Sequence, residues 1–102
     1  MKFSINLIFV FYFTFSSLLA NDYTILSFDD HPIQGTLVES NEDSLFLAII
    51  IAGSGPTDRD GNNSSMTSNY LKMLADELNK NGINSFRYDK RGVSKSLGDI
   101  KS

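Results

Sequence analysis

Apolar and polar positions after residue 22 divide the chain into short elements separated by turn-forming residues. Two β-prone runs, residues 23–28 (YTILSF) and 33–40 (IQGTLVES), flank the turn formers DDHP at 29–32. This pattern predicts an antiparallel hairpin. The segment 45–52 (LFLAIIIA) then gives eight apolar residues without alternation. Such a run is typical of a strand that is buried on both faces in a parallel sheet.

The second half of the chain has the pattern of a strand–helix–strand unit. A loop rich in Gly, Pro, Asp and Asn covers residues 53–63, and a helix is expected from about Ser68 to Lys80, capped by Thr67 or Ser68. Its apolar positions recur at helical spacing, at Tyr70, Leu71, Leu74 and Leu78. Gly82 suits the left-handed position after a helix, and a strand at 83–88 follows. The order predicts a right-handed βαβ crossover and an α/β sheet.

The N-terminal segment has the layout of a secretory signal peptide. Lys2 precedes an apolar stretch at 5–15 (INLIFVFYFTF), and small or polar residues lead to Ala20. We expect cleavage after Ala20 and export to the periplasm or the medium, so residues 1–20 are the signal and 21–102 the body. The main alternative is an uncleaved membrane anchor, the only case in which we expect membrane contact, and a buried core segment is the third.

Composition excludes several classes of protein. The 102 residues hold no cysteine, one histidine and a net charge of −3. Disulfide scaffolds, thiol nucleophiles and cysteine or histidine-rich metal sites are therefore excluded, and we expect no metal and no cofactor. The acidic balance also argues against a nucleic-acid partner.

The glycine-rich loop is the main candidate for chemistry. Gly53, Ser54 and Gly55 follow an apolar strand, where backbone N–H groups can hold negative charge; the alternative is a simple turn. Ser54 is not a nucleophile elbow, because G-x-S-x-G needs glycine at positions 52 and 56.

Other polar residues favour structural roles. We expect Asp58, Arg59 and Asp60 to form salt bridges within a solvated loop, and His31 to be an exposed turn residue and not a catalytic base.

Three motifs in order resemble the N-terminal part of α/β-hydrolases. They are residues 52–62 (AGSGPTDRDGN), 74–78 (LADEL) with the following Gly82–Ile83, and 87–93 (RYDKRGV). The chain is most similar to exported EstD-like esterases, near the serine aminopeptidase and dienelactone hydrolase-type families, over about residues 23–100.

The resemblance implies a role for the glycine-rich loop. The Ser54 amide stands where the family has an oxyanion-hole donor, and Gly53 and Gly55 shape the loop around it. Asp89 and Arg91 are implied to brace the loop after the fourth strand. Ser94 stands where the family usually has glycine, and strain is expected there if the backbone is left-handed.

The resemblance also implies that the hydrolase sheet is incomplete. The nucleophile, acid and histidine of the family would all follow Ser102, so this chain carries no catalytic residue and is expected to be inactive alone. The strand at 45–52 would then be an open apolar edge, with one helix unable to cover both faces. The implied parent is a serine hydrolase of small carboxylic esters. The alternatives are a small exported binding module that uses loop 53–63, and, more weakly, a nucleotide binder.

Overall fold

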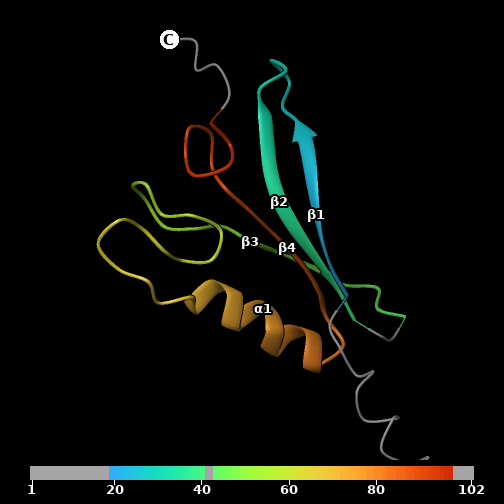
Figure 1. Ribbon diagram of the computed structural model, residues 1–102. Helices are drawn as coiled ribbons and strands as arrows, with labels where there is room; N and C mark the ends of the chain where they lie inside the picture. The colour runs from blue at the N-terminus through green and yellow to red at the C-terminus, as the bar shows by residue number, and fades with distance from the viewer. Residues whose placement is uncertain (1–18, 41–42, 98–102) are drawn as a thin grey trace, which may run out of the picture.

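The computed structural model describes residues 19–40 and 43–97, and its first feature is a hairpin. Strand β1 (Leu19–Leu26) pairs antiparallel with β2 (Pro32–Glu39), with Tyr23 opposite Gly35. The two strands stand side by side and are joined at one end of the molecule (Figure 1). The predicted hairpin is confirmed, because the turn formers at 29–32 separate two runs of β-prone residues.

The remaining elements form a parallel strand pair connected through a helix. Strand β3 (Leu47–Ile50) is followed by helix α1 (Tyr70–Lys80) and strand β4 (Asn84–Tyr88). β4 pairs parallel with β3 and antiparallel with β2, so the sheet order is β1-β2-β4-β3. This is the expected hairpin followed by a βαβ unit. Within the described residues β3 lies at an edge of the sheet, as the resemblance implied.

The core lies between the sheet and α1, which covers one face (Figure 1). Val38, Ile50 and Ala52 of the sheet side pack with Leu71 and Ala75 of the helix, and Ala75 is fully buried. Strand alternation places every second side chain toward the helix, and the helical repeat brings positions 71, 75 and 78 onto one stripe. Leu78 is the partly buried end of that stripe.

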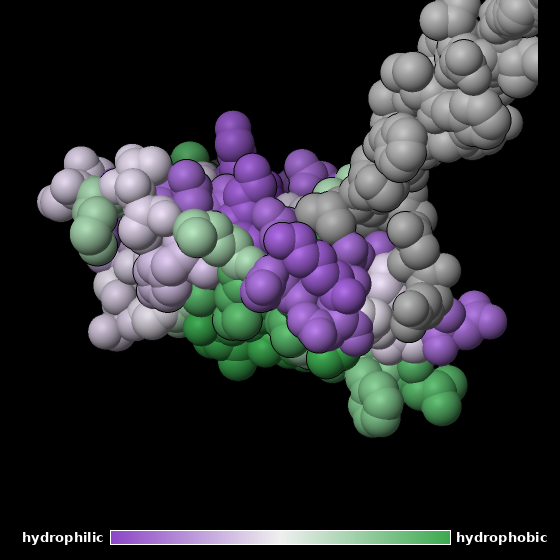
Figure 2. All heavy atoms as spheres, turned by 90° about the horizontal axis from the view of Figure 1, so that it is seen from below, coloured by the Kyte–Doolittle hydropathy of each residue, from purple (hydrophilic) through white to green (hydrophobic). Residues whose placement is uncertain are grey.

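The other sheet face is uncovered in the described part of the chain. Its apolar side chains line a groove of about 420 Å³, formed by Tyr23, Thr24, Ile25, Leu37, Leu47, Ile49 and Phe86. Figure 2 shows apolar side chains gathered along one side of the molecule. The expectation that β3 is buried on both faces is therefore wrong for these residues, because Leu47 and Ile49 are about half exposed, at 54% and 53%.

The helix begins two residues later than the spacing predicts, and an upstream loop residue holds the two residues that precede it. Asn69 occupies the N-cap in a left-handed conformation (φ 56°) and makes no side-chain cap bond. Instead, Asn62 Oδ1 accepts the backbone N–H groups of Ser68 and Asn69, both at 2.8 Å. The C-terminal prediction is confirmed, since Gly82 is left-handed with φ 76°.

The N-terminal strand overlaps the segment predicted as a signal peptide. Leu19 and Ala20 pair with Glu39 and Val38, so a cleavage after Ala20 falls inside β1. The predicted apolar stretch at 5–15 lies outside the described residues, and the signal remains a prediction. No helix in residues 19–40 and 43–97 is long and apolar enough to cross a membrane.

Candidate functional site

The candidate site lies where the parallel strands β3 and β4 end. Parallel neighbours point their carboxyl ends toward the same edge, and ligands of open α/β sheets bind beyond that edge. The glycine-rich loop follows β3, and residues 89–97 follow β4. Gly55 has φ 84°, a conformation that favours glycine, and no described atom lies within 4 Å of a Cβ built on Gly53 or Gly55. The loop is therefore open to an approaching molecule.

Ser54 presents its backbone N–H at this open position. The residue is exposed, and neither its amide nor its hydroxyl forms a hydrogen bond within the described residues. A backbone N–H without a protein acceptor, on a loop beyond a strand end, is free to donate to a bound molecule. The role of Gly53, Ser54 and Gly55 as an oxyanion-hole loop stays a prediction.

The Lys90 side chain donates hydrogen bonds to the glycine-rich loop, a contact that the sequence did not indicate. Its ammonium donates to the carbonyl oxygen of Gly53 and, at 2.7 Å, to that of Gly55. The motif DKRG placed Lys90 in the loop after β4. Nothing in the spacing, however, indicates that its side chain reaches a carbonyl 35 residues earlier in the chain.

Asp89 joins the two loops through one buried carboxylate, whose side chain is 1% exposed. Oδ1 accepts the Arg59 backbone N–H at 2.8 Å, and Oδ2 accepts that of Lys95 at 3.1 Å. The Arg59 guanidinium lies 3.8 Å from Oδ2. The Asp89 backbone N–H also donates to the Gln34 carbonyl of β2 at 2.9 Å. Asp89 thus links the loop after β3, the loop after β4 and strand β2.

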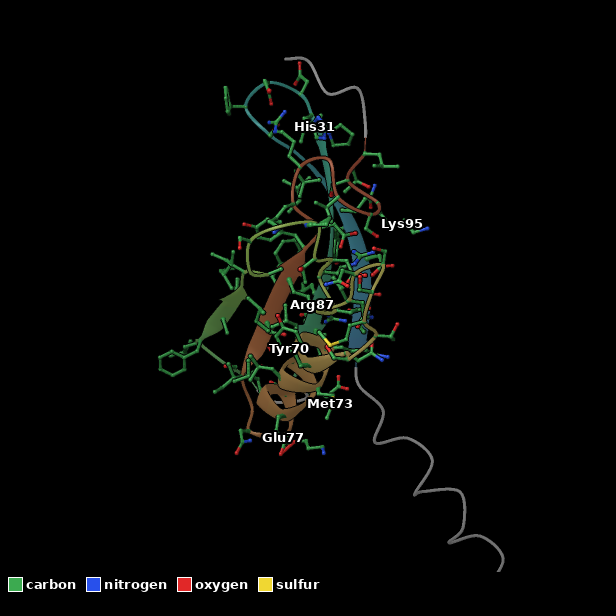
Figure 3. The ribbon with its side chains drawn as sticks, turned by 90° about the vertical axis from the view of Figure 1, so that its left-hand side faces the viewer. His31, Tyr70, Met73, Glu77, Arg87 and Lys95 are labelled. Atoms are coloured by element: carbon green, nitrogen blue, oxygen red, sulfur yellow. The ribbon has the colours of Figure 1, made fainter. Side chains whose placement is uncertain are left out.

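The ion pairs of loop 58–60 do not form within the loop, which corrects the sequence-based expectation. Arg59 pairs with Asp89, and Asp60 accepts from Nε of Arg87, a β4 residue, at 3.1 Å. Asp58 instead accepts the backbone N–H groups of Asp60 and Asn62, both at 2.9 Å. The loop packs across the end of β4, so its charges find partners there. Figure 3 shows Arg87 on β4.

His31 is buried, at 4% exposure, and the expectation of an exposed turn residue is wrong. Its Nε2 lies 2.9 Å from the Ser96 carbonyl oxygen, which can only accept, so Nε2 carries the proton. The Ser96 hydroxyl also accepts the Gln34 backbone N–H at 2.8 Å. The loop after β4 therefore covers the hairpin turn and buries His31 beneath it; Figure 3 shows His31 and Lys95 at the same end of the sheet.

Arg91 ties the same loop to the hairpin turn on the outside. Its guanidinium lies 2.6 Å from Asp29 Oδ1 and donates to Ser27 Oγ at 3.1 Å. The hydrogen bond from Arg91, supported by one from Ser27, holds the pKa of Asp29 well below its usual value, and the same pair raises the pKa of Arg91. Arg91 thus contacts the hairpin turn and not the glycine-rich loop.

The Asp29 pair gives a testable pH dependence. A lowered folded-state pKa means that the contact stabilises the turn above the ordinary carboxylate range and is lost as the pH falls through the lowered value. We expect Arg91→Gln to raise the Asp29 pKa toward its usual value, measured by carboxyl ¹³C NMR titration. Because both side chains are partly exposed, added salt should shrink the difference. Identical titration midpoints in the two proteins would contradict the assignment.

Ser94 is left-handed, with φ 49°, as the family's glycine at this position suggested. A left-handed residue with a Cβ costs about 1–2 kcal/mol, and the greater freedom of glycine in the unfolded chain offsets about 0.4–1 kcal/mol of the relief. We expect Ser94→Gly to raise the free energy of unfolding by about 0.5–1 kcal/mol. Ser94→Ala, which keeps the Cβ, is the control. Equal urea midpoints for the two variants would exclude strain.

Comparison with known proteins shows the fold. No protein-family model matches this chain, and neither does any curated protein. Among solved structures the chain is similar to the α/β hydrolase GrgF from Penicillium sp. sh18, with 21% identity and a TM-score of 0.58. The match covers 82% of this chain and 26% of that chain, so the chain spans about a quarter of that protein's length. The expected fold class, part of an α/β-hydrolase sheet, is confirmed.

Proposed function

We propose that this chain supplies the oxyanion-hole loop of a serine hydrolase that cleaves small carboxylic esters through an acyl-enzyme, in the exported EstD-like branch. The observation that carries the proposal is the Ser54 N–H, exposed beyond β3 and without a protein acceptor in the described residues. Such a donor accelerates ester cleavage because it stabilises negative charge that develops only in the tetrahedral transition state.

The catalytic roles that the proposal assigns to this chain follow from the residues that it contains. The sequence has no G-x-S-x-G, and His31 is occupied with the Ser96 carbonyl in the hairpin turn. In the proposal the nucleophile, acid and base therefore come from the full-length protein after Ser102, in the order known for α/β-hydrolases. Backbone N–H groups stabilise the oxyanion, so the reaction as proposed needs no metal or cofactor.

The test uses the full-length protein encoded by the gene. We expect the reading frame after Ser102 to encode G-x-S-x-G, and the purified protein to react with a fluorophosphonate probe and to hydrolyse p-nitrophenyl acetate. Replacing the serine of that motif by alanine should abolish both signals. A protein without the motif that neither reacts nor hydrolyses overturns the proposal. If that protein folds cooperatively, it favours an exported binding module that uses loop 53–63.

Export is part of the proposal and rests on the apolar stretch at 5–15 behind Lys2. N-terminal sequencing of protein from the periplasm or the medium should begin at Asn21. A membrane-bound product that retains Met1 would support the anchor instead.

A further inference from the structure

Lys90 is the residue of this site that the proposed function leaves without a role. Its ammonium donates to the Gly53 and Gly55 carbonyls, the two that bracket Ser54. Within the described residues Lys90 forms no ion pair with a carboxylate. Its side chain is thus committed to the backbone of the glycine-rich loop.

The geometry of one peptide links Lys90 to Ser54. The Gly53 carbonyl and the Ser54 N–H belong to the same planar unit, and no peptide bond among the described residues is cis. In a trans peptide the C=O and N–H point in opposite directions. A lysine that holds the Gly53 carbonyl on one side therefore turns the Ser54 N–H to the other side, away from Lys90.

The second hydrogen bond of Lys90, to the Gly55 carbonyl, restricts the backbone on the other side of Ser54. Gly55 is a left-handed glycine in an exposed stretch that no other hydrogen bond between described residues holds. The Lys90 bond to the Gly55 carbonyl, at 2.7 Å, anchors the chain on the far side of Ser54. Two anchors two residues apart restrict the rotation of the peptide between them.

The charge of Lys90 adds an electronic effect. A cationic donor on a carbonyl polarises the peptide, which strengthens the N–H of the same unit as a donor. The backbone of Lys90 is held in place because its neighbour Asp89 is bound to both loops and to β2.

We propose that Lys90 is a positioning residue, which holds the Gly53 and Gly55 carbonyls and thereby aims the Ser54 N–H at the oxyanion. The inference rests on the proposed function for its catalytic consequence, but the orientation of the peptide can be tested without it.

The kinetic test compares Lys90→Met with Lys95→Met in the full-length protein. Lys95 lies in the same loop and is exposed, and its ammonium forms no hydrogen bond or ion pair with another described residue. We expect Lys90→Met to lower kcat on a p-nitrophenyl ester by about tenfold with KM changed less than about twofold, because the donor acts in the transition state. Affinity for a trifluoromethyl ketone should fall in parallel, Lys90→Arg should recover part of kcat, and Lys95→Met should match the parent. An unchanged kcat in Lys90→Met overturns the inference.

A spectroscopic test separates the inference from the proposed function. With ¹⁵N-serine labelling, the Ser54 amide resonance should shift in Lys90→Met and stay in place in Lys95→Met. If the parent has no hydrolase activity and the Ser54 resonance still shifts, the positioning role stands and the proposed function fails. If the parent is active and the Ser54 resonance stays in place, the positioning role is wrong.

Discussion

Ser54→Pro is expected to lower ester turnover of the full-length protein by about a hundredfold or more, because proline has no N–H and would remove the proposed oxyanion donor. The Ser54 side chain is dispensable in this proposal, since its hydroxyl contacts no described residue. Ser54→Ala keeps the N–H and is the matched control, with turnover expected within about twofold of the parent.

The measurement is kcat and KM on a p-nitrophenyl ester, together with the inhibition constant of a trifluoromethyl ketone. Loss of a transition-state donor should weaken the inhibitor and lower kcat while leaving KM nearly unchanged. A thermal melt of both variants shows whether the proline disturbs the fold. A folded Ser54→Pro protein with the parent's kcat would remove Ser54 from the oxyanion hole.

Asp89→Asn is expected to lower the free energy of unfolding by about 3 kcal/mol. The carboxylate is 1% exposed, accepts two backbone N–H groups and faces the Arg59 guanidinium at 3.8 Å. An asparagine keeps one acceptor oxygen but turns an NH₂ group toward the second N–H. It also leaves the Arg59 charge, 14% exposed, without its counter-ion.

The matched control for this variant is Asp76→Asn. Asp76 is a half-buried residue of α1 whose side chain forms no hydrogen bond or ion pair within the described residues, so a change of less than about 0.5 kcal/mol is expected. Urea unfolding of the full-length protein gives both values. Equal midpoints for the two variants would show that Asp89 does not hold the loops together.

The elements of the fold were predictable because each depends on neighbouring residues. The turn formers at 29–32 mark the hairpin, the spacing of Leu71 and Leu78 marks the helix, and Gly82 marks its end. The start of α1 was misplaced because the chain before the helix is held by residues that are not next to it. Asn62 Oδ1 accepts the Asn69 N–H, and the Asp60 carbonyl accepts the Leu71 N–H.

The contacts between loops were not predictable, because their partners lie far apart in the sequence. Arg59 stands between two aspartates, and nothing local indicates that its counter-ion is Asp89. His31 follows two aspartates in a polar turn, yet residues 65 positions later cover it. The position of the Ser54 amide was indicated by the motif, whereas Lys90 could be found only from three-dimensional contacts.

The sheet face that α1 leaves uncovered and the edge strand β3 have a consequence while the protein is being synthesised. Synthesis proceeds from the N-terminus, so the segment up to β4 emerges before anything that follows it in the sequence. At that moment Leu47 and Ile49 are about half exposed, and the outer backbone groups of β3 lack a neighbouring strand among the described residues. An intermediate with such a surface binds holding chaperones and self-associates when they are scarce.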